Sequence, residues 1–465
     1  MTTATADIAP TPPGVRIPFP ARPAGRWIIG TLVTVILVAD TIGMLWLWNH
    51  GGNLHPHDAA ETLTSLARVT GYIGAYLALI QCLLLARLTF VEQIFGFDRL
   101  TIWHRWNGHV CLYLILAHVV FSIWGYSITD KLSLWGETST MIWGDIYPGM
   151  ITATVGTFLL VIVVFTSLVI VRRAMKYEWW YLVHFASYVG IALGWFHQIP
   201  TGDELVVDGN AQFYWKAQYV VTIVLIAWYR LLIPTWSTFY HRMTVAEVVR
   251  ENEHVVTVRI TGNRLDRLKA RPGQFFVWRF LTKGYWWTAH PFSLSELPDG
   301  TLRITVKDLG DHSGHVGQLK PGTRIIAEGP FGVFTSAVRT RNKVLLIAGG
   351  IGITPVRALA EEMLGDVVVI YRAMNDGEVI FREELERITK ESGAKLHYVI
   401  GDHRTPEGAR LLSPEHLLEL VPDIAERDTY LCGPPGMTHA TERSVRKAGA
   451  HRRLVHVERF AYSES

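Results

Sequence analysis

Residues 102–126 read IWHRWNGHVCLYLILAHVVFSIWGY, a run that is long and apolar enough to cross a bilayer as a helix. The run carries three histidines. His104 and His118 lie 14 positions apart, so on a helix they share one face, about 21 Å apart along the axis. His109 lies roughly 140–180° around the helix from both, which indicates a packing or hydrogen-bonding residue.

A second apolar run, residues 179–199, carries His184 and His197, which are 13 positions or about 20 Å apart. On an ideal helix these two histidines would miss a common face by about 140°. If both are to meet the first helix, the second helix must be overwound or must approach at an angle. Gly190 and Gly194 could permit this distortion.

These histidines predict a pair of metal sites. Neutral imidazole is an axial ligand of haem iron, and two helices with two histidines each at matched depths can hold two b-type haems. His104 with His184, the inner pair, would hold one haem near the cytosol, and His118 with His197, the outer pair, would hold the other near the outer face. The alternative is hydrogen bonding between helices. For one histidine the two interpretations would be even, but four at matched depths favour iron ligation.

Six runs are long enough to span the membrane: residues 27–48, 66–90, 102–126, 150–172, 179–199 and 212–233. The chain is 49% hydrophobic and only 18% charged, which is typical of a protein partly embedded in lipid. Residues 1–26 are rich in Pro, Ala and Thr and are predicted to be a disordered tail. The first run is too long for a signal-peptide core and is interpreted as an uncleaved span.

Basic residues favour one side of the predicted bundle. They precede the first run and occupy the second-to-third and fourth-to-fifth loops, whereas the opposite loops, 49–65, 127–149 and 200–211, contain only Lys131. The positive-inside rule therefore places the N-terminus and everything after residue 233 in the cytosol of a multi-pass plasma-membrane protein. Within the spans, Asp40 and Arg68 could pair with each other or line a wet pocket.

Charge and cysteine content exclude some functions. The net charge of +3 is too small to suggest a nucleic-acid partner. The three cysteines are widely spaced and form no C-x-x-C pair. This spacing argues against a disulfide framework and against a cysteine-ligated zinc or iron–sulfur centre.

The rest of the sequence predicts two further domains. Residues 241–340 contain short alternating strands separated by Pro-Gly and Asp-Gly turns, which predicts a small antiparallel β-barrel. Residues 341–465 alternate strands and helices, which predicts a doubly wound α/β domain with a parallel sheet. The expected fold is thus a multi-domain membrane protein, with a six-helix transmembrane domain over residues 27–240 followed by these two domains.

A glycine-rich turn joins the first α/β strand to its helix, in the sequence Gly349-Gly350-Ile351-Gly352-Ile353-Thr354-Pro355. Glycines let the backbone approach a phosphate, and the helix N-terminus can receive a pyrophosphate. Thr354 is expected to cap the helix, with Pro355 in its first position. Arg372 ends the next strand, where an arginine suits the 2′-phosphate of NADPH, although nearby Asp376 keeps NADH open.

Taken together, these signals resemble the ferric reductase and NADPH oxidase superfamily, over nearly the whole chain from about residue 27. The histidine spacings resemble those of its transmembrane domain, and the C-terminal half resembles the ferredoxin–NADP reductase fold. The segment His290-Pro291-Phe292-Ser293-Leu294-Ser295 is similar to the family's FAD motif. The resemblance implies that His290 lies near the FAD phosphates, Phe292 packs on the flavin and Ser293 bonds its N5 edge.

The resemblance implies further site residues. Gly310-Asp311-His312-Ser313-Gly314 is similar to a second phosphate-contacting turn, which adds His312 and Ser313. Cys432, Gly433 and Pro434 match the nicotinamide-side motif, where Cys432 would lie beside the hydride-transfer centre. Phe460 or Tyr462, in the aromatic C-terminus, would cover the flavin until nicotinamide displaces it.

The implied activity is electron transfer from cytosolic NAD(P)H, through FAD and two haems, to an external acceptor such as a ferric chelate. The family's oxidases carry a histidine one turn beyond the outer ligand, beside an arginine that Arg68 resembles, but here that histidine position is Ser122. This departure disfavours superoxide production as the main activity. Two alternatives are electron donation to a partner protein or quinone, and a histidine-lined proton channel, which would leave the nucleotide motifs unexplained.

Overall fold

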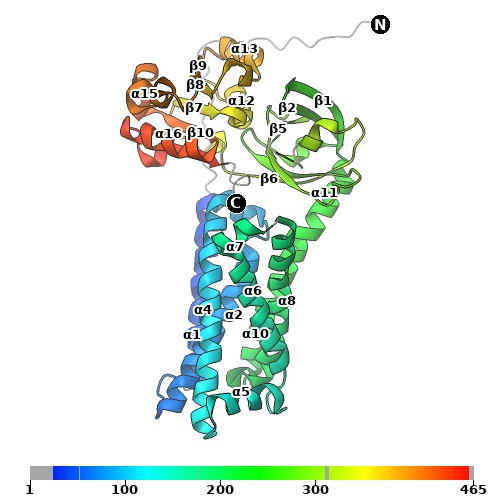
Figure 1. Cartoon of the computed structure of the whole chain (residues 1–465), viewed down its shortest axis with the longest axis vertical. Coiled ribbons are helices and arrows are strands. Elements are labelled where there is room, and N and C mark those ends of the chain that lie inside the picture. The colour runs from blue at the N-terminus through cyan, green and yellow to red at the C-terminus, as the bar shows by residue number, and fades with distance from the viewer. Residues whose placement is uncertain (1–24, 52, 176, 309, 311–313, 460–465) are drawn as a thin grey trace.

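The computed structural model describes residues 25–459 apart from residues 52, 176, 309 and 311–313. Long helices form an elongated bundle, and two sheet-containing domains lie together at one end of it (Figure 1). The short helix α5 lies at the opposite end (Figure 1).

Long helices account for most of the bundle: α1 Gly25–His50, α2 Ala59–Leu84, α4 Phe97–Thr129, α6 Met150–Ser167, α8 Tyr177–Thr201 and α10 Gly209–Ala227. A π-helical turn continues α10 into α11, Ile233–His241. The shorter helices are α3 Thr89–Phe95, α5 Leu134–Trp143, α7 Val169–Ala174 and α9 Asp203–Val207.

Five helical segments in the described chain are long and apolar enough to cross a membrane: Ile28–His50, Ala59–Leu84, Arg99–Thr129, Met150–Ser167 and Gly209–His241. These correspond to five of the six predicted spans. The sixth predicted span corresponds to α8, which is long enough but carries two histidines and many tryptophans and tyrosines, and is therefore less apolar.

Small residues let the helices pack closely in pairs. A Cβ on Gly74 of α2 would lie 3.1 Å from Ile115 of α4, and one on Gly156 of α6 would lie 2.6 Å from the carbonyl of Gly190 on α8. Helices in lipid associate through such close contacts because lipid and apolar side chains are equally apolar. The two helix pairs α2–α4 and α6–α8 therefore frame the bundle.

The domain after the bundle contains two three-stranded antiparallel sheets. One has the order β1–β2–β5 (Thr244–Asn252, Val255–Thr261 and Leu302–Lys307), and the other β4–β3–β6 (His290–Ser293, Phe275–Phe280 and Ile325–Phe331). Single bridges, Thr244 to Arg324 and Leu294 to Ile304, link strands outside the two ladders. Where the sequence predicts one barrel, the structure has two linked sheets around one core that includes Phe276 and Trp278.

The C-terminal domain has a parallel sheet in the order β11–β10–β7–β8–β9. Its strands are β7 Lys343–Gly349, β8 Asp366–Ala373, β9 Lys395–Ile400, β10 Asp428–Gly433 and β11 Val455–Arg459. The core on one face includes residues of α12 (Ile353–Glu362) and α13 (Arg382–Ser392), and the core on the other includes residues of α15 (Pro414–Leu420) and α16 (Pro435–Lys447). Helix α14 spans Pro406–Arg410. The sheet is thus doubly wound, as predicted.

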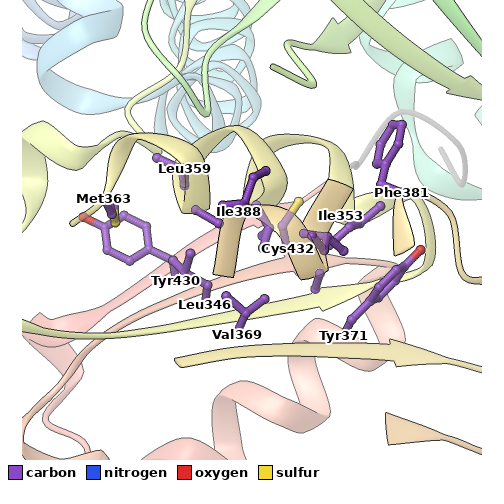
Figure 2. Close-up of a cluster of buried hydrophobic side chains, with 14 of the residues drawn as sticks. Leu346, Ile353, Leu359, Met363, Val369, Tyr371, Phe381, Ile388, Tyr430 and Cys432 are labelled. Atoms are coloured by element: carbon purple, nitrogen blue, oxygen red, sulfur yellow. The ribbon is translucent and has the colours of Figure 1, made fainter. Parts of the chain in front are cut away.

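The strand order reverses between β7 and β10, which makes their carboxyl ends the topological switch point where α/β sheets bind ligands. Figure 2 shows Cys432, at the end of β10, within the buried cluster that also contains Leu346, Ile353 and Tyr371.

Candidate redox site

The histidines of the bundle form two pairs. The ring centroids of His104 on α4 and His184 on α8 lie 6.0 Å apart, and those of His118 and His197, on the same two helices, lie 6.3 Å apart. The structure therefore brings together, in the predicted pairs, the four residues expected to hold haem iron. It does so with an uninterrupted α8, so the 13-residue spacing requires no break.

The spacing of each pair fits a metal held between two imidazoles. A nitrogen–metal bond is about 2.0 Å long, so two imidazoles on opposite sides of one ion leave their centroids about 6 Å apart. The Nδ1 atoms of His104 and His118 lie 3.2 and 2.8 Å from the backbone carbonyls of Gln81 and Ala67. Such a bond fixes the tautomer and leaves Nε2 with the lone pair that a metal needs.

The two charged residues inside the first spans do not pair with each other. Asp40 accepts hydrogen bonds from the Tyr214 hydroxyl and the Gln218 amide. Arg68 forms an ion pair with Asp203 instead. Of the two interpretations left open by the sequence, the Asp40–Arg68 pair is therefore wrong, because α10 supplies polar partners for Asp40 and α9 supplies a carboxylate for Arg68.

Helix α4 contacts the first sheet domain close to the inner histidine pair. Phe97 begins α4, seven residues before His104, and packs against the cluster of Phe275, Val277 and Phe331. Ala289, the residue before the predicted FAD motif, packs against the same cluster. Helix α4 therefore joins the inner histidine pair to the neighbourhood of that motif.

An ionic contact adds to this junction. Glu328 on β6 pairs with Arg87, which follows α2, and lies 3.6 Å from Arg230 of the π-helical turn. The guanidinium of Arg87 also lies 5.8 Å from the centroid of the Phe331 ring. Two different parts of the bundle are thus attached to one strand.

The predicted FAD motif is held on β4, which pairs with β3. The rings of His290 and Phe292 are stacked, with centroids 6.0 Å apart and planes inclined by 22°. Ser293 is 5% exposed, and the side chains of Leu294 and Ser295 are fully buried in the protein. The side chains of Leu294 and Ser295 therefore lie in the core beneath the motif.

A buried ionic cluster ties this motif to the α/β domain. Arg303 of β5 donates to both carboxylate oxygens of Glu384 at 3.0 Å, and Arg357 of α12 lies 2.8 Å from the same carboxylate. Both arginines also donate to the carbonyl of Ser295, at 2.8 and 3.3 Å. Each guanidinium side chain is only 3% exposed. The sequence gives no local signal for this cluster, because its members are far apart in the chain.

Packing explains two of the three glycines of the glycine-rich turn. A Cβ on Gly352 would lie 2.3 Å from the carbonyl oxygen of Cys432, and one on Gly349 would lie 2.0 Å from the sulfur of Met437. Gly350 is different, because its φ is +50° and nothing lies within 4 Å of its Cβ position. Gly350 is therefore the glycine with open space for a ligand.

The start of α12 differs from the prediction. The helix begins at Ile353, directly after a 3-10 turn over Gly350–Gly352, and Gly352 is its cap residue. The hydroxyl of Thr354 donates to the carbonyl of Ile351 at 3.0 Å, and Pro355 is the third helical residue. The expected capping by Thr354 and first position for Pro355 are therefore wrong, because the turn runs into the helix earlier than predicted.

A cavity of about 340 Å³ opens beside Gly350, between the β1–β2 turn and the ends of β7 and β8. Its volume falls in the range of small-molecule sites. Its lining residues are Asn252, Glu253, His254, Val255, Lys307, Gly350, Ile351, Tyr371, Asn375, Gly377, Glu378 and Ile380.

Cys432 is fully buried, and burial raises the pKa of its thiol well above the ordinary value, with a further rise from Glu458. The thiol is therefore neutral. A Cβ on Gly433 would meet the backbone of Gly349 at 3.2 Å, which places the predicted nicotinamide-side motif, including Pro434, against the glycine-rich turn.

Arg372 is largely buried, at 8% exposure. Its Nη1 donates to the backbone carbonyls of Ala373 and Val399. Part of the guanidinium is thus engaged by the sheet itself. Four other predicted site residues, His312, Ser313, Phe460 and Tyr462, lie outside the described residues.

A helical bundle with paired histidines, joined to an α/β domain with a glycine-rich turn at its switch point, defines a membrane oxidoreductase. Residues 70–195 match the family described as ferric reductase like transmembrane component, and residues 346–443 match the oxidoreductase NAD-binding domain. The bundle is therefore similar to the ferric reductase like transmembrane component, and the α/β domain is similar to the oxidoreductase NAD-binding domain.

Individual relatives agree with these family matches. An NADPH oxidoreductase of Mycobacterium tuberculosis is 30% identical over 50% of this chain and 63% of its own length. Ferric/cupric reductase transmembrane component 1 of Candida albicans is 24% identical over 79% of this chain and 48% of its own length. The chain thus spans less than two thirds of either relative.

Solved structures are similar to about half of the chain. The flavohem-like FAD/NAD binding domain of nitric oxide dioxygenase from Vibrio cholerae is 23% identical, with a TM-score of 0.39, over 47% of this chain and 98% of that one.

Proposed function

We propose that this protein moves electrons from cytosolic NAD(P)H, through FAD and two b-type haems, to an external acceptor, with ferric iron preferred. The two histidine pairs, with ring centroids 6.0 and 6.3 Å apart, are the observation that carries the proposal. They lie about 21 Å apart along α4, a spacing that suits two carriers in a hydrocarbon core about 30 Å thick.

The proposed membrane placement rests on six spans, with α8 as the sixth. It also rests on exposed tryptophans near both ends of the bundle. Trp103 and Trp124 are both exposed on α4, and their 21-residue separation corresponds to about 31 Å. Trp135 and Trp143 on α5 are 82% and 70% exposed. Tryptophan favours both membrane–water interfaces. With the basic loops on the sheet-domain side, this arrangement supports a plasma-membrane protein whose two sheet domains are cytosolic.

The cytosolic residues have positioning roles in this proposal. When bound, a flavin converts the electron pair of a hydride into the single electrons that haem iron carries. His290 and Phe292 would line the flavin, and the open space at Gly350 would admit the dinucleotide phosphates. Cys432 and Gly433 would border the nicotinamide, where the neutral thiol of Cys432 excludes water without adding charge.

The acceptor is tested by reoxidation of the reduced, purified protein in a stopped-flow instrument with ferric chelate, oxygen and quinone side by side. Because Ser122 occupies the position of an oxidase histidine, ferric chelate should reoxidise the protein fastest, and in air most electrons should appear as ferrous iron. Superoxide accounting for nearly all NAD(P)H consumed, with ferric chelate present, would contradict the proposal. Fastest reoxidation by quinone would instead indicate a donor to the quinone pool.

The donor is proposed to be NADPH, with Arg372 contacting its 2′-phosphate. A charge-assisted contact contributes about 1.5–3 kcal/mol, or roughly ten- to a hundredfold in affinity. Wild type should therefore have the higher kcat/KM with NADPH, and Arg372→Ala should lose most of this preference while retaining NADH turnover. Steady-state kinetics with both donors measure it, and equal or better use of NADH by wild type would refute it.

Arg404→Ala is the matched control for this substitution. Arg404 is 71% exposed, follows the neighbouring strand β9 and pairs with Asp402 at 2.6 Å. Since Arg372 also holds two backbone carbonyls, the melting temperature of both variants should be recorded. A loss of NADPH preference in Arg404→Ala alone would assign the phosphate contact to the loop after β9.

A further inference from the structure

The end of the bundle remote from the sheet domains is strongly acidic. The loops 49–65, 127–149 and 200–211 contain a single lysine and eight carboxylates: Asp58, Glu61, Asp130, Glu137, Asp145, Asp203, Glu204 and Asp208. The positive-inside rule explains the scarcity of lysine and arginine here. It does not explain the carboxylates, because Asp and Glu contribute little to topology.

Most of this negative charge is not neutralised by cations. Among the described residues, Arg68 is the one cation that forms ion pairs with this group, through Asp203 and Glu204. Asp58 and Asp208 accept backbone N–H bonds at helix starts, which satisfies their oxygens without removing their charge. The face therefore retains a net negative potential.

Several carboxylates at this end of the bundle act electrostatically on one residue, Tyr147. Burial, together with Tyr126, Asp130, Glu137 and Asp203, raises the pKa of Tyr147 to about 12. Tyr147 also stacks edge-on against Tyr126, with ring centroids 5.7 Å apart. The carboxylates thus converge around this tyrosine pair.

The acidic group is adjacent to the outer histidine pair. The carbonyl of Ala67 lies 2.8 Å from Nδ1 of His118, and the next residue is Arg68, which pairs with Asp203. An acceptor attracted to these carboxylates would therefore be close to the point where electrons leave the bundle.

Besides the negative charge of these loops, the acidic group contains a buried carboxylate without a partner, Glu137. Its side chain on α5 is fully buried, and neither carboxylate oxygen has a hydrogen-bond partner among the residues that the structure describes. Burying a carboxylate without a partner is costly, and a cation or a proton relieves the cost. Glu137 is therefore a buried, unpartnered carboxylate within the acidic group that can take up a cation or a proton.

We propose that this acidic face selects cationic acceptors, such as hydrated metal cations or cationic metal complexes, over anionic ferric chelates. This inference rests on the proposed outward electron transfer and names its substrate class. Each acceptor gains one electron, so Fe³⁺ becomes Fe²⁺. One NAD(P)H loses a hydride to reduce two acceptors, and one proton remains in the cytosol. A charged surface of this kind raises the encounter rate of the opposite charge by about 10–10³-fold.

The test compares two one-electron acceptors of opposite charge, hexaammineruthenium(III) and ferricyanide, with the full-length protein in nanodiscs. Raising the ionic strength from 0.01 to 0.15 M shortens the Debye length from about 30 to about 8 Å. For wild type, kcat/KM with the ruthenium cation should fall at least about tenfold, and kcat/KM with ferricyanide should rise.

The variant Asp130→Asn/Glu137→Gln/Asp145→Asn removes three carboxylates for which the structure describes no cationic partner. At low salt, the kcat/KM of this variant for the ruthenium cation should fall at least about tenfold, because KM rises. Its kcat/KM for ferricyanide should increase. The control Glu383→Gln/Glu407→Gln/Glu419→Gln removes the same charge from exposed positions of the α/β domain and should change neither value.

The outcomes separate the two proposals. If neither acceptor is reduced although NAD(P)H reduces the flavin, outward electron transfer itself is refuted. If both acceptors are reduced with the same salt dependence, or if ferricyanide is preferred at low salt, the charge selection is refuted and the reductase remains. An equal effect of the control variant would also overturn the assignment to the outer face.

Discussion

Replacement of His118 or His197 by alanine should abolish reduction of the external acceptor while NAD(P)H still reduces the flavin at the wild-type rate. Substitutions that only support a metal ligand cost about 10–100-fold, so loss of a ligand itself should cost at least about 100-fold. The reduced-minus-oxidised spectrum should show half the low-spin b-type haem of wild type, which should contain about two haems per FAD. Pyridine haemochrome assay and stopped-flow absorbance measure both quantities.

His109→Ala is the matched control, because His109 lies on the same helix but bonds only the carbonyl of Arg105, at 2.7 Å, among the described residues. It should retain both haems and most of the activity. A haem-free wild-type preparation with full activity would overturn the proposed path. Retention of two haems by His118→Ala would show that another residue ligates the outer iron.

The second large effect is expected from Glu384→Ala, which removes the carboxylate that Arg303 and Arg357 share. Each arginine would keep one other carboxylate, Glu296 at 3.2 Å for Arg303 and Glu361 at 2.6 Å for Arg357. Breaking a buried ion pair typically costs 3–5 kcal/mol, and because Glu384 is 32% exposed we expect about 3 kcal/mol. For a module of this size, that corresponds to a fall of about 6–12 °C in melting temperature. Flavin should also be released earlier on heating, since both arginines hold the carbonyl of Ser295.

The pH dependence distinguishes this ionic effect from lost packing. Burial alone would raise the pKa of Glu384, but the hydrogen bonds and charges of Arg303 and Arg357 lower it overall. A lowered folded pKa means that the stabilisation is complete above the unfolded value of about 4.3 and is lost as the pH falls through the folded pKa. The difference in melting temperature between wild type and variant should therefore shrink below about pH 4.3.

Glu383→Ala removes an exposed carboxylate from the same helix and should shift the melting temperature by little. Thermal melts followed by flavin fluorescence, at pH 7 and at pH 4, provide the measurement. A Glu384→Ala variant as stable as wild type at pH 7 would show that Glu296 and Glu361 are sufficient partners for the two arginines.

Much of the fold could be predicted because hydrophobic pattern and turn residues are local signals. The sequence pattern predicts strands over Val255–Thr261 and Phe275–Phe280 and a helix over Pro414–Leu420, and the structure has these three elements with the same bounds. The pairing of His104 with His184 and of His118 with His197 followed from helical rise alone. Such features depend on neighbours within one element.

Other features depended on contacts that sequence does not encode locally. Strand β4 is short and contains Pro291, so it gave no strand pattern, and its place is set by pairing with β3. The tyrosine partner of Asp40 and the carboxylate partner of Arg68 come from helices more than 130 residues away. Glu384 could not be distinguished from any other helical glutamate before Arg303 and Arg357 were seen to meet on it.

Helix α4 determines how far apart the proposed redox centres lie. A single continuous helix, Phe97–Thr129, begins in the core beside the FAD motif and then carries one histidine of each pair. From Phe97 the rise is about 10 Å to His104 and a further 21 Å or so to His118. The helix thus fixes the axial distances between Phe97, His104 and His118. On the proposed electron path, the spacing between the two haems would be set by the rise of one continuous helix, and movement of loops elsewhere would leave that spacing unchanged.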